Sequence, residues 1–72
     1  MGEIKSLGWN IRQARKEKGL TQQELADIVG VSQNAICEFE NDKYLPSLRN
    51  WVILDKTLNI GYEQMYYILL NA

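Results

Sequence analysis

The sequence predicts an all-α protein of five short helices around one core. Apolar residues recur at intervals of three and four along the chain, which is the period of an amphipathic helix. Residues typical of helix caps stand between these segments. No segment shows the sustained alternation of apolar and polar residues that indicates a strand, and no hairpin turn pair is present.

The first helix is predicted over about residues 4–18. Its apolar residues lie at helical spacing: Ile4, Leu7, Ile11 and Ala14. Gly19 follows as a residue suited to ending a helix. Three basic residues precede it, and the negative end of the helix dipole favours them.

The next two helices are predicted over about residues 22–29 and 33–41. Thr21 and Glu24 have the spacing of a capping box. Gly30 suits the sharp turn that follows, because glycine adopts a positive φ without strain, and Ser32 suits the N-cap of the third helix. Asp42 follows that helix and is a residue type that tolerates left-handed geometry. Two helices joined by a three-to-four-residue turn containing Gly indicate a helix-turn-helix, with its core at about residues 21–42.

A fourth helix is predicted over about residues 48–58, after Pro46 and a capping Ser47. A largely apolar set at spacings of three and four residues lies along it: Leu48, Trp51, Val52, Asp55 and Leu58. A fifth helix is predicted over about residues 62–70, and its core face is expected to comprise Tyr62, Met65, Tyr66 and Leu69. Tyr67, Ile68 and Leu70 lie on its other sides. Either the core surrounds this helix more fully, or these residues form the contact of a symmetric homodimer.

Composition excludes several classes of protein. A chain of 72 residues forms a single domain, residues 1–72. Its longest apolar run, residues 65–70, is far too short to cross a membrane, and its N-terminus does not resemble a signal peptide, so we expect a cytoplasmic protein. One cysteine and no histidine leave no internal disulfide and no usual zinc site. Without a catalytic constellation, we expect no enzyme activity, no cofactor and no metal.

The charge is unevenly distributed. The net charge is -1, yet residues 1–20 hold five basic and two acidic side chains. Residues 21–40 hold four acidic side chains and no basic one. Any contact with a polyanion therefore needs basic residues from outside this central segment.

The segment LTQQELADIVGVSQNAICEFENDKYLPSL, residues 20–48, resembles the helix-turn-helix domains of phage repressor and Cro-like regulators, also called the xenobiotic-response-element type. The resemblance covers about residues 8–70. It implies a lambda-repressor-like fold and a sequence-specific transcriptional regulator, a repressor that binds a palindromic operator in double-stranded DNA as a homodimer. The second helix would cross the DNA backbone and the third would enter the major groove.

The same resemblance implies roles for individual residues. By position, Gln22, Asn41 and Lys43 would contact phosphates. The residues expected to face the bases are Ser32, Gln33, Asn34, Cys37 and Glu38. The amides of Gln33 and Asn34 suit adenine, and the Glu38 carboxylate can accept from cytosine N4, although it also repels phosphates. The alternative is that this polar face is simply solvated.

Arg15 and Glu40 occupy positions that form a partly buried ion pair in some members of the family. Two departures from the family stand out: Asp42 replaces a common Gly, and the third helix has no cation. Affinity for DNA would then depend on Lys43, the basic first helix and a second subunit. Two other functions stay open: a protein-interaction module that uses its acidic surface, and an antitoxin or restriction-controller type of regulator.

Overall fold

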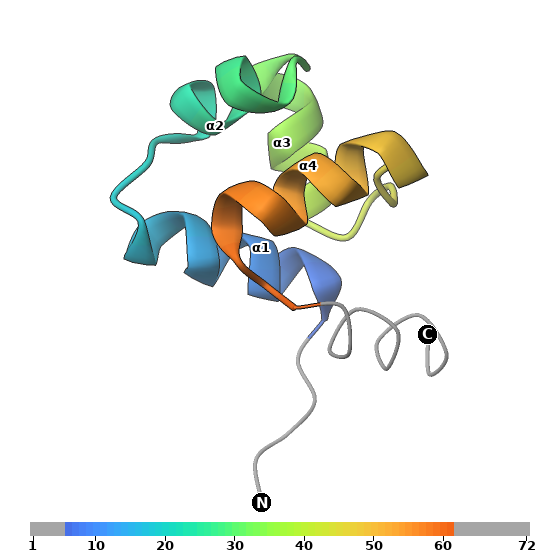
Figure 1. The fold of residues 1–72 in the computed structure, drawn as a ribbon. Coiled ribbons are helices and arrows are strands. Elements are labelled where there is room, and N and C mark those ends of the chain that lie inside the picture. The colour runs from blue at the N-terminus through green and yellow to red at the C-terminus, as the bar shows by residue number, and fades with distance from the viewer. Residues whose placement is uncertain (1–5, 62–72) are drawn as a thin grey trace, which may run out of the picture.

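The computed structural model describes residues 6–61, which form four helices and no strand. They are α1 (Leu7–Glu17), α2 (Gln22–Val29), α3 (Gln33–Glu40) and α4 (Leu48–Leu58) (Figure 1). The predicted all-α class is confirmed. The predicted fifth helix, residues 62–70, lies outside the described residues, so a count of five is not confirmed. None of the helices within residues 6–61 is long and apolar enough to cross a membrane.

The helix-turn-helix forms as its local signals predict. The Thr21 hydroxyl accepts from the Glu24 backbone N–H at 3.0 Å, and the Glu24 carboxylate accepts from the Thr21 N–H at 2.9 Å. Gly30 ends α2 with a φ of +84°, and the Ser32 hydroxyl caps α3 by accepting from the Ala35 N–H. Asp42, after α3, has the left-handed φ of +59° that its residue type tolerates.

The start of α1 differs from the prediction. The helix begins at Leu7 because Ser6 has an extended backbone and caps the helix, its hydroxyl accepting from the Trp9 N–H at 3.1 Å. The first helix therefore begins three residues after the predicted start. A serine near the start of an apolar repeat is a capping signal that takes precedence over the periodicity.

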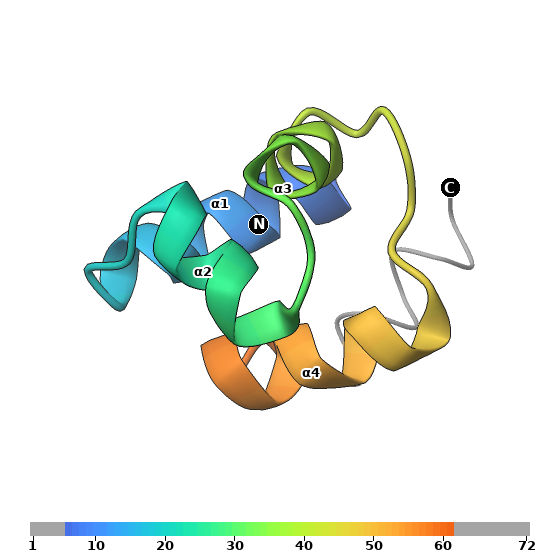
Figure 2. The same cartoon turned by 90° about the horizontal axis from the view of Figure 1, so that it is seen from above.

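The core is formed by side chains from all four helices. Its buried apolar residues are Leu7, Ile11, Leu25, Ala26, Val29, Ile36, Phe39, Trp51, Leu54 and Leu58. α2 contacts both α3 and α4, whereas α3 and α4 lie on opposite sides of the core (Figure 2). The outer side of α3 is therefore not covered by α4.

The set predicted at helical spacing along α4 differs from the residues that pack in the core: it includes the exposed Leu48, and it omits Leu54 and the partly buried Ile53. Leu48 is 76% exposed, and Leu54, which the prediction omitted, is fully buried. Leu48 is the first residue of α4, and Tyr44 and Leu45 in the loop before the helix are exposed as well. Helical spacing gives the direction of a side chain but not how far along the helix the neighbouring helices extend.

Gly8 places α1 directly against the end of α3. A Cβ atom on Gly8 would lie 2.5 Å from the carbonyl oxygens of Phe39 and Glu40. The Gly8 N–H donates to the Asp42 carboxylate at 2.9 Å, and it is one of the first four N–H groups of α1, which have no partner within the helix. The Asp42 that departs from the family pattern therefore helps to cap α1, where the positive end of the helix dipole favours a carboxylate.

Candidate nucleic-acid interface

The predicted base-facing residues lie together on the outer side of α3. Ser32, Gln33 and Asn34 are exposed at its N-terminal end, and Cys37 and Glu38 are half-buried one turn later. The opposite side of the helix is anchored by buried Ile36 and Phe39. A rigid helix thus presents amide and carboxylate groups to the outside of the domain.

Two of these polar side chains are paired with each other. The Asn34 amide donates to the Glu38 carboxylate, with 2.8 Å between Nδ2 and Oε1. The sequence analysis did not predict this pair, although side chains four residues apart on one helix are neighbours that can form such a hydrogen bond.

Two of the three predicted phosphate-contacting residues lie just after α3. The Asn41 amide donates back to the Cys37 carbonyl oxygen at 2.8 Å, and the same oxygen accepts from the Asn41 backbone N–H at 3.0 Å. Lys43 is exposed two residues further on. Asn41 is therefore held against α3, whereas the Lys43 side chain extends into solvent.

Gln22, the third predicted phosphate contact, belongs to a buried polar network. Its amide donates to Glu40 Oε1 at 3.2 Å. The Glu40 carboxylate also accepts from Arg15 twice, at 2.7 Å from Nε and 3.2 Å from Nη2. The side chains of Arg15 and Glu40 are only 11% and 3% exposed, so the predicted partly buried ion pair is confirmed.

This network joins three elements of the fold. Arg15 also donates from Nη1 to the Leu20 carbonyl oxygen at 2.8 Å, at the turn between α1 and α2. The guanidinium of α1, the carboxylate of α3 and the amide of α2 are thereby held together. Arg15 is consequently not a free cation for a polyanion, and the contact of Gln22 with Glu40 had no signal in the sequence.

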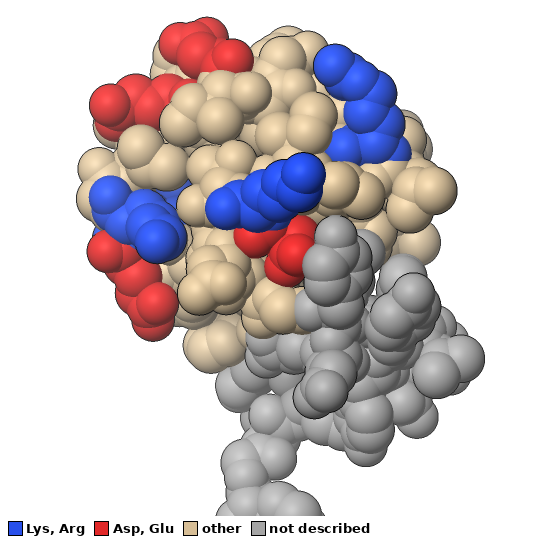
Figure 3. Space-filling view, viewed as in Figure 1, with Lys and Arg blue, Asp and Glu red and all other residues tan. Residues whose placement is uncertain are grey.

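The remaining cations do not gather on the helix-turn-helix. α2 and α3 hold four acidic residues and no basic one. The exposed basic residues of the described chain are Arg12, Lys16, Lys18, Lys43, Arg49 and Lys56. On the face that Figure 3 shows, the basic side chains are separated by uncharged surface. α2 and α3 themselves therefore supply no cation for a contact with a polyanion.

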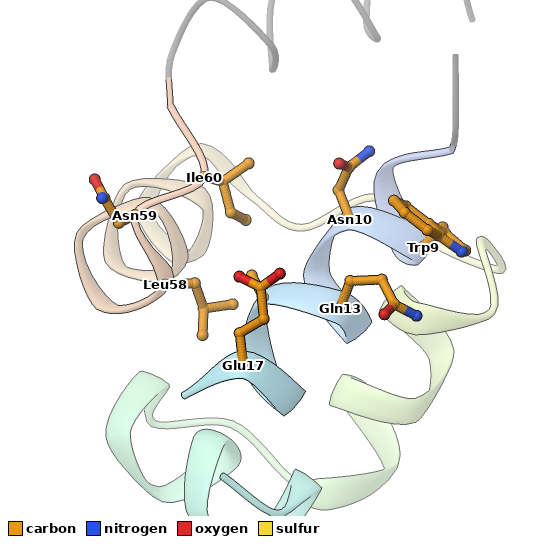
Figure 4. A pocket seen from close by; sticks show the side chains of 8 residues that line it. Trp9, Asn10, Gln13, Glu17, Leu58, Asn59 and Ile60 are labelled. Carbon is orange, nitrogen blue, oxygen red and sulfur yellow. The ribbon is translucent and has the colours of Figure 1, made fainter. Parts of the chain in front are cut away.

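A pocket lies elsewhere, between α1 and the end of α4 (Figure 4). Trp9, Gln13 and Glu17 line it from one side, and Leu58 and Ile60 from the other. None of the candidate DNA-contacting residues lines it. Among residues 6–61, no group of three His, Cys, Asp or Glu side chains is arranged to hold a metal ion.

α2 and α3 are two capped helices joined by a turn that contains Gly30, and α3 is exposed along its polar side. This arrangement defines a helix-turn-helix protein. The chain belongs to the helix-turn-helix family, whose sequence model matches residues 11–64. The predicted membership in the phage repressor-like group is thereby confirmed, and this family comprises DNA-binding transcriptional regulators, not enzymes.

Two known proteins are similar to more than half of the chain. An uncharacterised HTH-type transcriptional regulator of Methanothermobacter thermautotrophicus is 55% identical over 38 residues, which are 53% of this chain and 55% of that protein. The ImmF control region 10 kDa protein of Bacillus phage phi105 is 37% identical over 60 residues, covering 78% of this chain and 67% of its own. The chain thus spans only about half the length of the archaeal regulator.

A solved structure supports the same fold. The P22 c2 repressor, crystallised with a synthetic operator, matches this structure with a TM-score of 0.76 and 33% identity. The match covers 79% of this chain and 86% of the repressor chain. The lambda-repressor-like helix-turn-helix fold is therefore established for the described residues.

Proposed function

We propose that this chain is a sequence-specific DNA-binding regulator that represses transcription by occupying a palindromic operator as a homodimer. The observation that carries the proposal is the exposed polar side of α3, held by a buried opposite side on a fold shared with an operator-bound repressor. α3 would enter the major groove, while the N-terminus of α2 approaches the backbone.

The proposed contacts follow from the geometry of each side chain. Gln33 and Asn34, exposed in the first turn of α3, read base edges, with Ser32, Cys37 and Glu38 beside them. Lys43 neutralises a phosphate, and Asn41 contacts the backbone near it. Gln22 bonds Glu40 through one N–H, which leaves its second N–H for a phosphate oxygen at the positive end of α2.

The charge distribution supports a dimer. With no cation on α2 or α3, one subunit neutralises few phosphates, so its affinity for DNA is low. Two subunits on one site would add their contacts, with recognition helices about 34 Å apart, one turn of DNA. This symmetry matches a palindromic operator.

Selection of duplexes from a random pool, followed by titration at rising salt, tests DNA binding. We expect salt-dependent binding that enriches a palindrome. Gln33→Ala should change the preferred bases, whereas Lys43→Ala should weaken binding to all sequences alike and lower the salt slope by about one. Circular dichroism controls for the fold of each variant. Absence of binding even at about 50 mM salt would contradict the proposal.

Sedimentation of the full chain at micromolar concentration tests the dimer. We expect a species of twice the 8.3 kDa chain mass, with its contact in the predicted fifth helix at residues 62–70. Leu70→Glu should then release monomers, while Leu48→Glu, at an exposed site of α4, should not. A monomer in the unaltered chain would refute the dimer, and release by Leu48→Glu alone would place its contact at the start of α4.

One observation favours a second function. Three acidic residues of α2 and α3 lie outside the buried ion pair of Glu40: Glu24, Asp27 and Glu38. They give the helix-turn-helix a surface suited to a basic protein partner rather than to DNA. A protein-interaction module on the same fold is therefore the alternative, and the duplex titration separates the two.

A further inference from the structure

We propose that Glu38 is a positioning residue that holds the Asn34 amide in one orientation, so that the pair selects adenine and rejects guanine at one base of each half-site. The inference rests on the proposed function and deepens it, because it assigns a base preference to a pair of side chains within the interface.

The geometry fixes which end of the amide faces Glu38. Asn34 Nδ2 lies 2.8 Å from Glu38 Oε1, one helical turn away on the outer side of α3. An ionised carboxylate only accepts hydrogen bonds, so the NH₂ group must face Glu38 and the Asn34 carbonyl oxygen must face away. One N–H of Asn34 is thereby used, and one N–H and the carbonyl oxygen remain.

The remaining N–H and the carbonyl oxygen of Asn34 are complementary to adenine. Adenine presents an acceptor at N7 and a donor at N6 in the major groove, which match one N–H and one carbonyl oxygen. Guanine presents two acceptors, N7 and O6, and would need two donors. A free asparagine could turn its whole NH₂ group toward guanine, but an asparagine held by Glu38 has only one N–H to offer.

The rest of α3 strengthens this preference. The helix carries no Arg or Lys, which are the usual partners of guanine. This absence acts against guanine and does not act against adenine.

The same carboxylate has an opposing effect on overall affinity. A negative charge at the interface weakens binding to every sequence through its repulsion of phosphates. Glu38 is thus expected to raise discrimination while it lowers affinity. These opposite signs distinguish positioning from a merely structural role, which would lower both through unfolding.

The test compares Glu38→Gln with a matched variant on the neighbouring helix. Gln23 and Asp27 form a similar exposed amide–carboxylate pair on α2, with 2.9 Å between Nε2 and Oδ1. Asp27→Asn therefore removes the same charge without touching Asn34. Both variants and the unaltered chain are put through selection of random duplexes and titration of single-base variants of the selected site.

We expect Glu38→Gln to raise the affinity for random duplex. It should also reduce the preference for adenine over guanine at one position by about fivefold or more, which is the lower end of the discrimination that a bidentate contact gives. A glutamine can either accept from or donate to Asn34, so both amide orientations become available. Asp27→Asn should raise affinity without altering any base preference.

A second pair of variants separates positioning from direct contact. In an Asn34→Ala background, Glu38→Gln should have no further effect on base preference. If it still changes the preference there, Glu38 reads the base itself and the proposal is wrong. It is also wrong if Glu38→Gln changes affinity alone, as Asp27→Asn does. Failure of the unaltered chain to bind any duplex would instead refute the proposed function, and the inference with it.

Discussion

Glu40→Ala is expected to lower the free energy of unfolding by about 3–5 kcal/mol, the range for removing one partner of a buried ion pair. The Glu40 side chain is 3% exposed and receives hydrogen bonds from both Arg15 and Gln22. Its removal leaves a guanidinium buried without a counter-charge. A domain of 72 residues has a total stability of roughly 4–11 kcal/mol, so this single change removes a large share of it.

Denaturant unfolding measures the effect. Glu40→Gln, which keeps the shape and one acceptor oxygen, should lose less stability and keeps the test usable if the alanine variant does not fold. Asp27→Ala, at an exposed acid of α2, is the control and should cost less than about 1 kcal/mol. A loss below about 0.5 kcal/mol for Glu40→Ala would mean that the pair behaves as a surface salt bridge.

The double variant Arg15→Met/Glu40→Met sharpens the same test. Replacing both charges removes the uncompensated guanidinium, so the double variant should be more stable than Glu40→Ala alone. If it is not, then the destabilisation comes from lost packing around Glu40 rather than from the unpaired charge.

Gly8→Ala is expected to destabilise the domain by about 2–3 kcal/mol through overpacking. Alanine would be favoured over glycine in a helix by about 0.5–1 kcal/mol, which acts in the opposite direction. The new Cβ would however lie 2.5 Å from two backbone carbonyl oxygens of α3, and backbone cannot rotate away as a flexible side chain can. The steric cost of Gly8→Ala is therefore expected to exceed the stability gained from the higher helix propensity of alanine.

Thermal unfolding should show a fall in Tm of about 8 °C or more for Gly8→Ala. Asp42→Asn is the control: it keeps an acceptor oxygen for the Gly8 N–H and a residue type that tolerates a positive φ, so it should change stability little. An unchanged or raised Tm for Gly8→Ala would contradict the close approach of α1 to the end of α3.

The helix-turn-helix could be predicted almost to the residue because its signals are local. The capping box at Thr21, the turn at Gly30 and the cap at Ser32 each act within about four residues of chain. Such interactions depend on the neighbouring sequence and need no knowledge of the fold. The predicted start of α1 is wrong because Ser6 caps the helix within the apolar repeat, and α1 begins at Leu7.

The candidate site could be predicted in part. The side of α3 that carries Gln33 and Asn34 followed from helical periodicity together with the family resemblance. The pairing of Asn34 with Glu38 was open to prediction from spacing alone. The bond from Gln22 to Glu40 was not, because it joins residues 18 positions apart on two helices.

The short-range signals of caps, turns and apolar periodicity thus specify the class of fold, the turn between α2 and α3 and the polar side of α3. The close approach at Gly8, the exposure of Leu48 and the contact of Gln22 with Glu40 became visible only once the helices were packed. Caps and amphipathic periods are energetic preferences of short segments. Which atoms meet across helices depends on how the helices pack, and the sequence of one helix does not contain its neighbour's position.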